Sequence, residues 1–316
     1  MANNNLYNGM CRFWMAALLA LWAFAASAGD KPDFLADADW LAKNLKNPKL
    51  VVLEIRYHPH RYFTVGHIPG AVQVQRFKDL GDNHAIPSMR FPSREAFEHT
   101  LRSWGVNNDS TLVLYDDSVT AMTSRVYFFL LDLYGYDMKR VKILNGGTLE
   151  WSAFNDMAKE EPRRKPGNVR LKPAKPGVVV EWTDVYRDVV ARRDPNIVLL
   201  DSRPADMYTG KVIQHSIRGG HIPGAINVVS LDGADGQSQS WKSLDEIAAM
   251  YKAIPKDKTI YTYCHDGFRS SLAWLQLKTL GYRDVRIYNG GWGDWGNNLT
   301  LPVSEGAQPY DEAFAL

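Results

Sequence analysis

The chain has 316 residues with 37 basic and 35 acidic side chains, so its formal net charge is only +2 at neutral pH. This even balance argues against a nucleic-acid-binding surface, and the length suits two domains of ordinary size. The sequence contains no zinc-ligand set, phosphate-binding glycine loop or dinucleotide fingerprint. We therefore expect no metal and no organic cofactor.

Residues 1–28 have the pattern of a secretory signal peptide. Arg12 is their one charged residue, an apolar run occupies 13–25, and the small residues at 26–28 form a cleavage site. The apolar run is shorter than the roughly 20 residues that a membrane span requires, although an uncleaved anchor is the alternative. We expect an exported protein, periplasmic or secreted, with no stable membrane contact after cleavage.

Cleavage would leave one cysteine, Cys264, because Cys11 lies in the leader. An exported protein can form disulfides, but this chain then has no pair to join. An unpaired cysteine is a liability in an oxidising compartment, so we expect Cys264 to be kept for its chemistry. Any sulfur that it carries must leave to an external acceptor.

One pattern occurs twice in the same order, in units that we call the first copy and the second copy. His67 of the first copy matches His221 of the second. A residue present in the copy without the cysteine more often serves the fold, so we expect both histidines to be structural. We expect a first domain at 29–161, a proline- and lysine-rich linker at 162–178 and a second domain at 179–316. The matched segments are 51–56 with 198–203, 66–71 with 220–225, 112–116 with 260–264, and the Asn-Gly-Gly elements at 145–147 and 289–291.

Short apolar strands alternate with helical segments in each copy. In the second copy we expect helices at 182–193, 243–251 and 272–280, and strands at 197–201, 225–229, 260–263 and 285–288. Gly281 stands where a C-cap glycine would end the last of these helices. This alternation predicts an α/β fold in which each copy is a mainly parallel sheet flanked by helices. Ligands bind beyond the carboxyl ends of the strands in such sheets, and Cys264 follows one of these ends.

Cys264 begins the loop Cys-His-Asp-Gly-Phe-Arg-Ser, between an expected strand and an expected helix. Gly267 lets the loop turn without a Cβ atom. The positive end of the helix dipole and the charge of Arg269 favour the thiolate, which is the reactive form of cysteine. A buried structural cysteine is the alternative. Asp116 takes the equivalent position in the first copy, which therefore lacks the nucleophile.

The sequence resembles the tandem-domain rhodaneses, the thiosulfate and 3-mercaptopyruvate sulfurtransferases, over essentially the whole mature chain. The resemblance rests on the two Gly-His-Ile-Pro-Gly-Ala boxes, the Asp-Ser-Arg end of the strand at 201–203, the two Asn-Gly-Gly-x3-Trp elements and the cysteine loop. It implies two tandem rhodanese-like domains, of which only the second is catalytic.

The resemblance implies that Cys264 takes the outer sulfur of a donor such as thiosulfate and becomes a persulfide. An acceptor, cyanide or a thiol, then removes the sulfur, so the cycle has two steps. The N–H groups of residues 265–269 would hold the persulfide anion. Phe268 would either shield the persulfide or pack the loop onto the core. The implied substrate-binding residues are Arg203, His265, Asp266, Gly267, Phe268 and Arg269.

Two departures from the family pattern leave the sulfur donor open. Asp266 stands where thiosulfate-using members usually have lysine and mercaptopyruvate-using members usually have a small residue. Met207 stands where both groups carry an arginine. Arg203 and Arg269 are placed to compensate for the missing charge, and Arg218 is a further candidate.

Two other functions fit the sequence. The first is a sulfur carrier or protein-binding module without turnover, for which Asp266 would suit a cationic or protein donor. The second is a rhodanese-fold phosphatase, which is less favoured because the four residues between Cys264 and Arg269 make a shorter loop than phosphatases use. We expect a small-molecule sulfur donor and acceptor, with a thiol protein as an alternative acceptor, and no nucleic acid.

Overall fold

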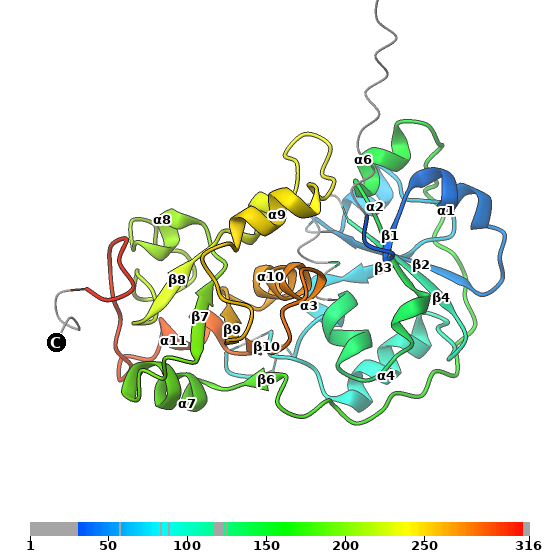
Figure 1. The fold of residues 1–316 in the computed structure, drawn as a ribbon. Coiled ribbons are helices and arrows are strands. Elements are labelled where there is room, and N and C mark those ends of the chain that lie inside the picture. The colour runs from blue at the N-terminus through cyan, green and yellow to red at the C-terminus, as the bar shows by residue number, and fades with distance from the viewer. Residues whose placement is uncertain are drawn as a thin grey trace, which may run out of the picture. The chain divides into compact units, whose positions relative to one another are not determined.

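Each copy of the repeat forms one five-stranded sheet in the part of the chain that the structure describes (Figure 1). The computed structural model describes residues 31–56, 58–82, 84–87, 89–116, 123 and 126–311, so the predicted signal peptide lies outside it. The strand order is β1-β5-β4-β2-β3 in the first copy and β6-β10-β9-β7-β8 in the second. All neighbouring strands are parallel, which confirms the predicted fold class.

The first copy places helices between its strands. Its strands are β1 (Leu35–Ala36), β2 (Leu50–Arg56), β3 (Val72–Gln75), β4 (Thr111–Tyr115) and β5 (Val141–Leu144). Its helices are α1 (Ala38–Asn44), α2 (Arg61–Thr64), α3 (Arg76–Asp79), α4 (Arg94–Ser103), the π-helical η1 (Val126–Asp132), the short 3-10 turn η2 (Met138–Arg140) and α6 (Gly147–Ser152).

The second copy repeats this arrangement, and most of its elements lie where the sequence predicts them. Its strands are β6 (Val179–Val180), β7 (Ile197–Asp201), β8 (Ala225–Asn227), β9 (Thr259–Tyr263) and β10 (Val285–Tyr288). Its helices are α7 (Trp182–Val185), the π-helical η3 (Tyr186–Ala191), α8 (Ala205–Tyr208), the 3-10 turn η4 (Ser230–Gly233), α9 (Leu244–Met250), α10 (Phe268–Thr279) and α11 (Gly291–Trp295). The helix predicted at 272–280 begins earlier, at Phe268, so the cysteine loop is short.

Local sequence signals fix the end of α10. Gly281 has a φ of +86°, which glycine adopts without a steric cost. Its N–H donates to the Lys278 carbonyl (3.1 Å), and the Tyr282 N–H donates to the Leu277 carbonyl (3.0 Å). These two bonds form a Schellman motif, which satisfies carbonyls that the helix end leaves open. The predicted glycine cap is therefore confirmed.

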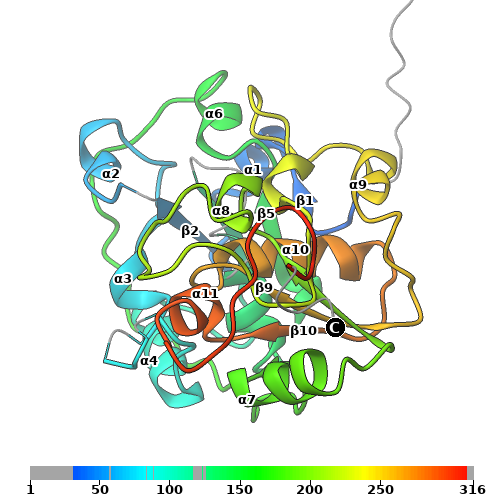
Figure 2. The same ribbon diagram turned by 90° about the vertical axis from the view of Figure 1, so that its left-hand side faces the viewer.

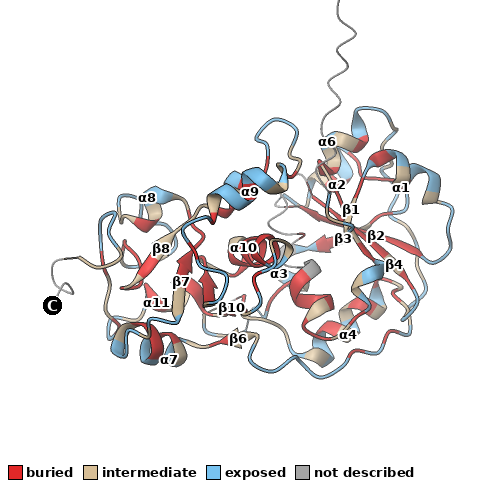
Figure 3. Ribbon diagram, viewed as in Figure 1, coloured by how far each residue is buried: buried red, intermediate tan, exposed pale blue. Residues whose placement is uncertain are grey.

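One apolar core joins the two copies. Figure 3 shows the strands of both sheets and α10 as mostly buried. The rings of Phe128 and Trp274, from η1 and α10, have centroids 3.8 Å apart. Phe34 of the first copy meets Trp241 of the second edge to face at 5.3 Å. Burial of apolar and aromatic surface of this kind stabilises the contact between the copies.

The Asn-Gly-Gly elements make a second, polar link between the copies. The Asn145 side-chain oxygen accepts a hydrogen bond from the N–H of Trp241 (2.9 Å). In the reverse direction, the Asn289 side-chain oxygen accepts one from the N–H of Phe91 (3.2 Å). Each copy therefore offers a loop N–H to the asparagine of the other copy. The sequence shows both asparagines as matched residues but not this exchange.

The segment between the two sheets runs without a helix or strand over residues 162–178. It is not detached from the first copy, because Val169 is fully buried and its N–H donates to the Val106 carbonyl (3.2 Å). The domain boundaries given above stay predictions. In the described part of the chain, no helix is both long enough and apolar enough to cross a membrane.

Candidate active site

Cys264 lies at the carboxyl end of β9, which sits between β7 and β10 in the second sheet. The chain turns through residues 264–267 and enters α10 at once (Figure 2). Gly267 makes this turn with a φ of +93°, a conformation that residues with a Cβ atom rarely adopt. The turn directs the first N–H groups of a 12-residue helix toward the cysteine, where the helix dipole favours negative charge.

Two donors contact the sulfur directly. The N–H of Gly267 lies 3.2 Å from Sγ of Cys264, and the hydroxyl of Ser270 lies 3.6 Å from it. Ser271 donates to the Gly267 carbonyl (2.6 Å) and so braces the turn. Donors of this kind stabilise a thiolate or a persulfide anion more than a neutral thiol. Ser270 was missing from the predicted site, although it belongs to the quoted loop motif.

Helix α11 holds the loop from outside. The N–H of Trp292 donates to the Cys264 carbonyl (2.7 Å), and the N–H of Gly293 donates to the His265 carbonyl (3.0 Å). Gly291 has a φ of +57°, and a Cβ atom there would lie 2.6 Å from the Cys264 carbonyl oxygen. The second Asn-Gly-Gly element is therefore part of the site. Its glycines were the sequence signal, but the repeat alone suggested a role in the fold.

Arg269 and Arg203 supply positive charge in different ways. Arg269 is partly exposed, and its guanidinium forms no hydrogen bond or ion pair with any other described residue. Arg203 is buried, and its Nε and Nη2 atoms bind the carboxylate of Asp201 at 2.6–3.0 Å. The guanidinium carbon of Arg203 also lies 4.4 Å from the centre of the Trp292 ring. Burial opposes its charge, but the attraction of Asp201 prevails and raises the pKa of Arg203. Of the two, Arg269 is the one whose charge is available to a ligand.

His265 and Asp266 lie at the partly exposed face of the loop, whereas Cys264 is fully buried. Burial lowers the pKa of His265 below its ordinary value of 6.5; Asp266 opposes this shift, while Arg203 adds to it. His265 is therefore neutral at neutral pH and adds no fixed positive charge. The imidazole of His215, absent from the predicted site, has its centroid 5.8 Å from that of His265.

Phe268 and Arg218, considered above for the site, have structural roles. Phe268 is 4% exposed and belongs to the apolar core, so it packs the loop onto the protein. Arg218 donates to the carbonyl oxygens of Trp295 (2.9 Å) and Asn298 (2.5 Å), and also to those of Gly296 and Leu301. Its guanidinium closes the end of α11. Arg218 therefore does not compensate for the charge of Asp266.

The repeated histidines support the fold in the same way in both copies. His67 stacks on Tyr62 at 3.6 Å, and its ring nitrogens face the carbonyl oxygens of Tyr62 and Glu160. His221 stacks on Tyr208 at 3.8 Å and faces the carbonyl oxygens of Tyr208 and Gln308 in the same manner. Both are fully buried, so both serve packing.

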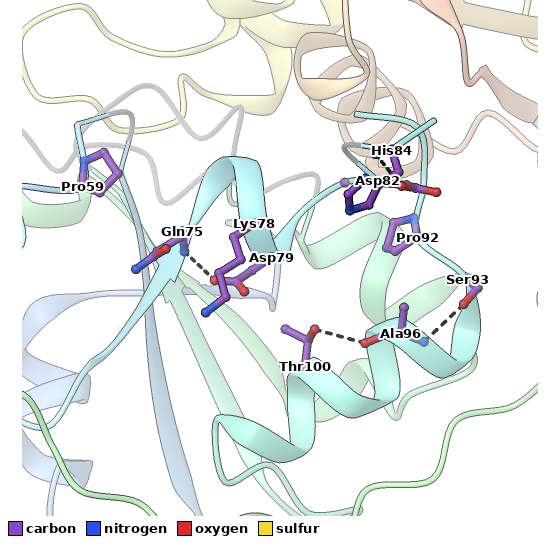
Figure 4. A pocket seen from close by; sticks show the side chains of 11 residues that line it. Pro59, Gln75, Lys78, Asp79, Asp82, His84, Pro92, Ser93, Ala96 and Thr100 are labelled. Atoms are coloured by element: carbon purple, nitrogen blue, oxygen red, sulfur yellow. Dashed lines mark hydrogen bonds between the residues drawn. The ribbon is translucent and has the colours of Figure 1, made fainter. Parts of the chain in front are cut away.

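The first copy contains a cavity of about 620 Å³ between β3, α3 and α4 (Figure 4). None of the predicted site residues lines it. Its polar groups are engaged locally: the carboxylate of Asp79 accepts the N–H of Gln75 (2.7 Å), and the Ser93 hydroxyl accepts the N–H of Ala96 (3.2 Å). Among the described residues, no group of three or more metal-ligating side chains is close enough to hold an ion.

Comparison with known proteins decides the family. The rhodanese-like domain model matches residues 37–154 and 188–298. The chain belongs to the tandem-domain rhodanese family.

This rhodanese is 32% identical over 295 residues to the sulfur carrier protein TtuD of Thermus thermophilus, with 88% of this chain and 98% of TtuD covered. It is 29% identical over 278 residues to the 3-mercaptopyruvate sulfurtransferase of Escherichia coli, with 84% and 96% covered. The crystal structure of SseA from Escherichia coli superposes with a TM-score of 0.71 at 28% identity, over 82% of this chain and 98% of SseA.

The anaerobic ergothioneine biosynthesis enzyme of Chlorobium limicola also superposes, with a TM-score of 0.74 over 87% of this chain and 71% of that one. At 22% identity, this likeness shows the fold alone.

Proposed function

We propose that this rhodanese is a sulfurtransferase that moves a sulfane sulfur from a small donor to a thiophilic acceptor through a persulfide on Cys264. The observation that carries the proposal is the sulfur environment. Sγ of Cys264 receives the Gly267 N–H and the Ser270 hydroxyl at the positive end of α10. Such a site suits a sulfur that is anionic both before and after it accepts a second sulfur.

In the first step, with thiosulfate as donor, the Cys264 thiolate attacks the outer sulfur. A new sulfur–sulfur bond forms at Cys264, the sulfur–sulfur bond of thiosulfate breaks, and sulfite leaves with the electron pair. Arg269 attracts the dianion, since its guanidinium has no other hydrogen-bonding or ionic partner among the described residues. The N–H of Gly267 and the hydroxyl of Ser270 hold the persulfide anion.

In the second step, an acceptor thiolate or cyanide attacks the outer sulfur of the persulfide. The bond to Cys264 breaks, and the cysteine leaves as the same stabilised thiolate that began the cycle. The acceptor is external, because Cys264 is the only cysteine outside the leader. A thiol on another protein satisfies this chemistry as well as a small molecule does.

Asp266 bears on the choice of donor. Its charge repels the sulfonate of thiosulfate, while Arg269 attracts it, so we expect thiosulfate to be a competent donor with a high KM. The likeness to the Escherichia coli 3-mercaptopyruvate sulfurtransferase supports 3-mercaptopyruvate as the competing donor. Its single carboxylate is repelled less strongly than a dianion.

Intact-mass analysis of the mature protein tests the proposal. Incubation with thiosulfate should add one sulfur atom, cyanide should remove it, and the Cys264→Ser variant should gain nothing. A gain with 3-mercaptopyruvate alone would retain the persulfide mechanism and reject thiosulfate as donor. If no donor loads Cys264 in a folded sample, the sulfurtransferase proposal is wrong.

The likeness to the sulfur carrier protein TtuD favours a second candidate, a carrier that hands its persulfide to a protein without rapid turnover. Steady-state kinetics separate the two functions. Many turnovers of thiosulfate with cyanide support an enzyme, whereas stoichiometric loading that only a protein thiol discharges supports a carrier.

We further propose that the protein acts outside the cytoplasm, on the leader pattern of residues 1–28. N-terminal sequencing of the protein recovered from the periplasm or medium should begin at Gly29. Recovery of the full-length chain in the cytoplasm would contradict export.

A further inference from the structure

The segment before the second Gly-His-Ile-Pro-Gly-Ala box is longer than its counterpart in the first copy. Ten residues along the chain lead from Arg56 to Gly66, and seventeen lead from Arg203 to Gly220, although each arginine binds the carbonyl of its glycine in the same way. The anchoring frame is therefore conserved between the copies. The extra length lies in a loop at residues 209–219, which is exposed at 211–215 and 217 and has no counterpart of this length in the first copy.

This loop is fastened to α11, the helix that shapes the catalytic turn. Trp292 donates its indole N–H to the Ser216 hydroxyl (3.1 Å), and that hydroxyl donates to the Arg218 carbonyl (2.9 Å). The N–H of Ile217 donates to the side-chain oxygen of Asn297 (2.8 Å). Because Trp292 also binds the Cys264 carbonyl through its N–H, one residue holds both the loop and the nucleophile.

These anchors present His215 to the site. His215 adopts a φ of +56°, a left-handed conformation that is unfavourable for a residue with a Cβ atom. Its side chain is exposed, so burial does not offset this cost. What the conformation achieves is a position: the imidazole centroid lies 5.8 Å from that of His265, the residue directly after Cys264. Strain held in place by specific anchors is typical of functional residues.

We propose that His215 accepts the proton of the acceptor thiol in the second half of the sulfur-transfer cycle. This rests on the proposed sulfurtransferase function. The acceptor RSH gives its proton to the His215 imidazole and becomes RS⁻. The thiolate attacks the outer sulfur of the Cys264 persulfide, the bond between that sulfur and Sγ breaks, and Cys264 leaves as a thiolate. The product is RSS⁻, and His215 later returns the proton to water, so atoms and charge balance.

The neighbouring groups are less suited to this task. The groups that act on the His265 imidazole are Asp266, Arg203, Arg269 and His215. Guanidinium groups stay protonated, and a carboxylate is a weak base near neutral pH. His265 is only partly exposed, and burial lowers its pKa. His215 is the exposed imidazole of the group, and histidine is the side chain whose ordinary pKa is closest to neutrality.

The test separates the two half-reactions. Wild type and His215→Asn are first loaded with a sulfur donor, and the persulfide is confirmed by intact mass; asparagine also tolerates a left-handed φ. The loaded proteins are then mixed rapidly with glutathione, an alkyl thiol, or with a nitro-substituted thiophenol that is already ionised. We expect discharge to glutathione to slow about 100-fold in His215→Asn, with discharge to the aryl thiolate and the loading rate unchanged.

Two further variants guard against trivial explanations. His99→Asn removes another exposed imidazole, on α4, and should match wild type. His215→Gly should be as slow as His215→Asn with glutathione, and added imidazole should restore its rate. An equal loss with both acceptors, or an unchanged glutathione rate, overturns the assignment of His215 while the persulfide mechanism stands. Failure of loading in the wild type would reject the sulfurtransferase proposal itself, and this inference with it.

Discussion

The two copies share a buried frame and differ in the amino-acid sequence that follows the central strand. In the first copy, Glu54 pairs with Arg56 inside the protein and also accepts the hydroxyl of Tyr115. In the second copy, Asp201 pairs with Arg203 in the same place. The tyrosine hydroxyl accepts a box N–H in each case: Tyr115 from Ile68 at 2.9 Å, and Tyr263 from Ile222 at 3.2 Å.

This likeness shows that the acid–arginine pair belongs to the fold and not to the chemistry. A buried charge must be paired to be tolerated, and each copy meets that requirement with an acid–arginine pair, whether or not a cysteine is present. Catalytic capacity therefore depends on a few residues. Asp116 replaces Cys264, and none of the residues at 117–120 is a glycine that could match Gly267.

The strongest test moves the nucleophile between the copies. Cys264→Ser should abolish persulfide formation, and adding Asp116→Cys should not restore it. The repeat aligns Val119 with Gly267, and a β-branched residue does not readily make a left-handed turn. Intact mass after incubation with a sulfur donor is the measurement. A sulfur on residue 116 of the double variant would show that the shared frame, rather than the turn, creates the reactivity.

A matched pair of glycines tests whether α11 positions the catalytic turn. A Cβ at Gly291 would lie 2.6 Å from the Cys264 carbonyl oxygen, and one at Gly147 would lie 2.0 Å from the Asp116 carbonyl oxygen. Gly291→Ala and Gly147→Ala should each lower the free energy of unfolding by about 1–3 kcal/mol. Only Gly291→Ala should also reduce kcat/KM, by about 100-fold. Equal activity losses in the two variants would contradict a positioning role for Gly291.

The exchanged asparagine contacts should contribute equally if the copies are truly symmetric. Asn145→Ala removes the acceptor for the Trp241 N–H, and Asn289→Ala removes the acceptor for the Phe91 N–H. Each should cost about 1–3 kcal/mol in the free energy of unfolding, measured with denaturant. Only Asn289→Ala should also change the rate of sulfur transfer, because its element carries α11. Clearly unequal losses in the free energy of unfolding for the two variants would contradict the symmetry of the copies.

The smallest expected effect concerns the titration of His265. Its pKa should lie below 6.5 by NMR, because burial lowers it, and Asp266→Asn should lower it further because the carboxylate opposes the shift. The unfolded state then binds the proton more readily than the folded state, so this group makes stability fall as the pH drops through 6.5. Asp206→Asn, an exposed change on α8, should leave the titration unmoved. A His265 pKa above 6.5 would contradict the assignment.

The sequence predicted the elements that depend on local signals. Strands β7 and β10 have the expected bounds, and the glycine after α10 caps the helix as expected. The predicted start of α10 was four residues too late, because the first turn of the helix carries serines and an arginine instead of a periodic apolar face. That turn is fixed by the bond from the Ser271 N–H to the Gly267 carbonyl, which apolar spacing does not reveal.

Contacts between distant segments could not be predicted from one sequence. The cysteine motif identified the loop, but Trp292 and His215 reach it from segments that periodicity relates only to their own elements. Arg218 shows the opposite error. Its charge suggested compensation for the family's missing basic residues, yet its guanidinium donates to four carbonyl oxygens. Charge in a sequence does not reveal which charges the fold has already neutralised or bound.

Residues 289–293, which include the start of α11, contact both the first copy and the catalytic loop. At the first residue, the Asn289 side chain is attached to the Phe91 loop of the first copy. At the last two residues, the N–H groups of Trp292 and Gly293 donate hydrogen bonds to the carbonyls of Cys264 and His265. A displacement of the Phe91 loop would therefore reach Cys264 through one hydrogen bond at Asn289, the short backbone segment to Trp292, and a second hydrogen bond. A second copy expressed alone would retain Cys264 and the hydrogen-bond donors to its sulfur, Gly267 and Ser270. It would lose the contact between Phe91 and Asn289 that helps to position them.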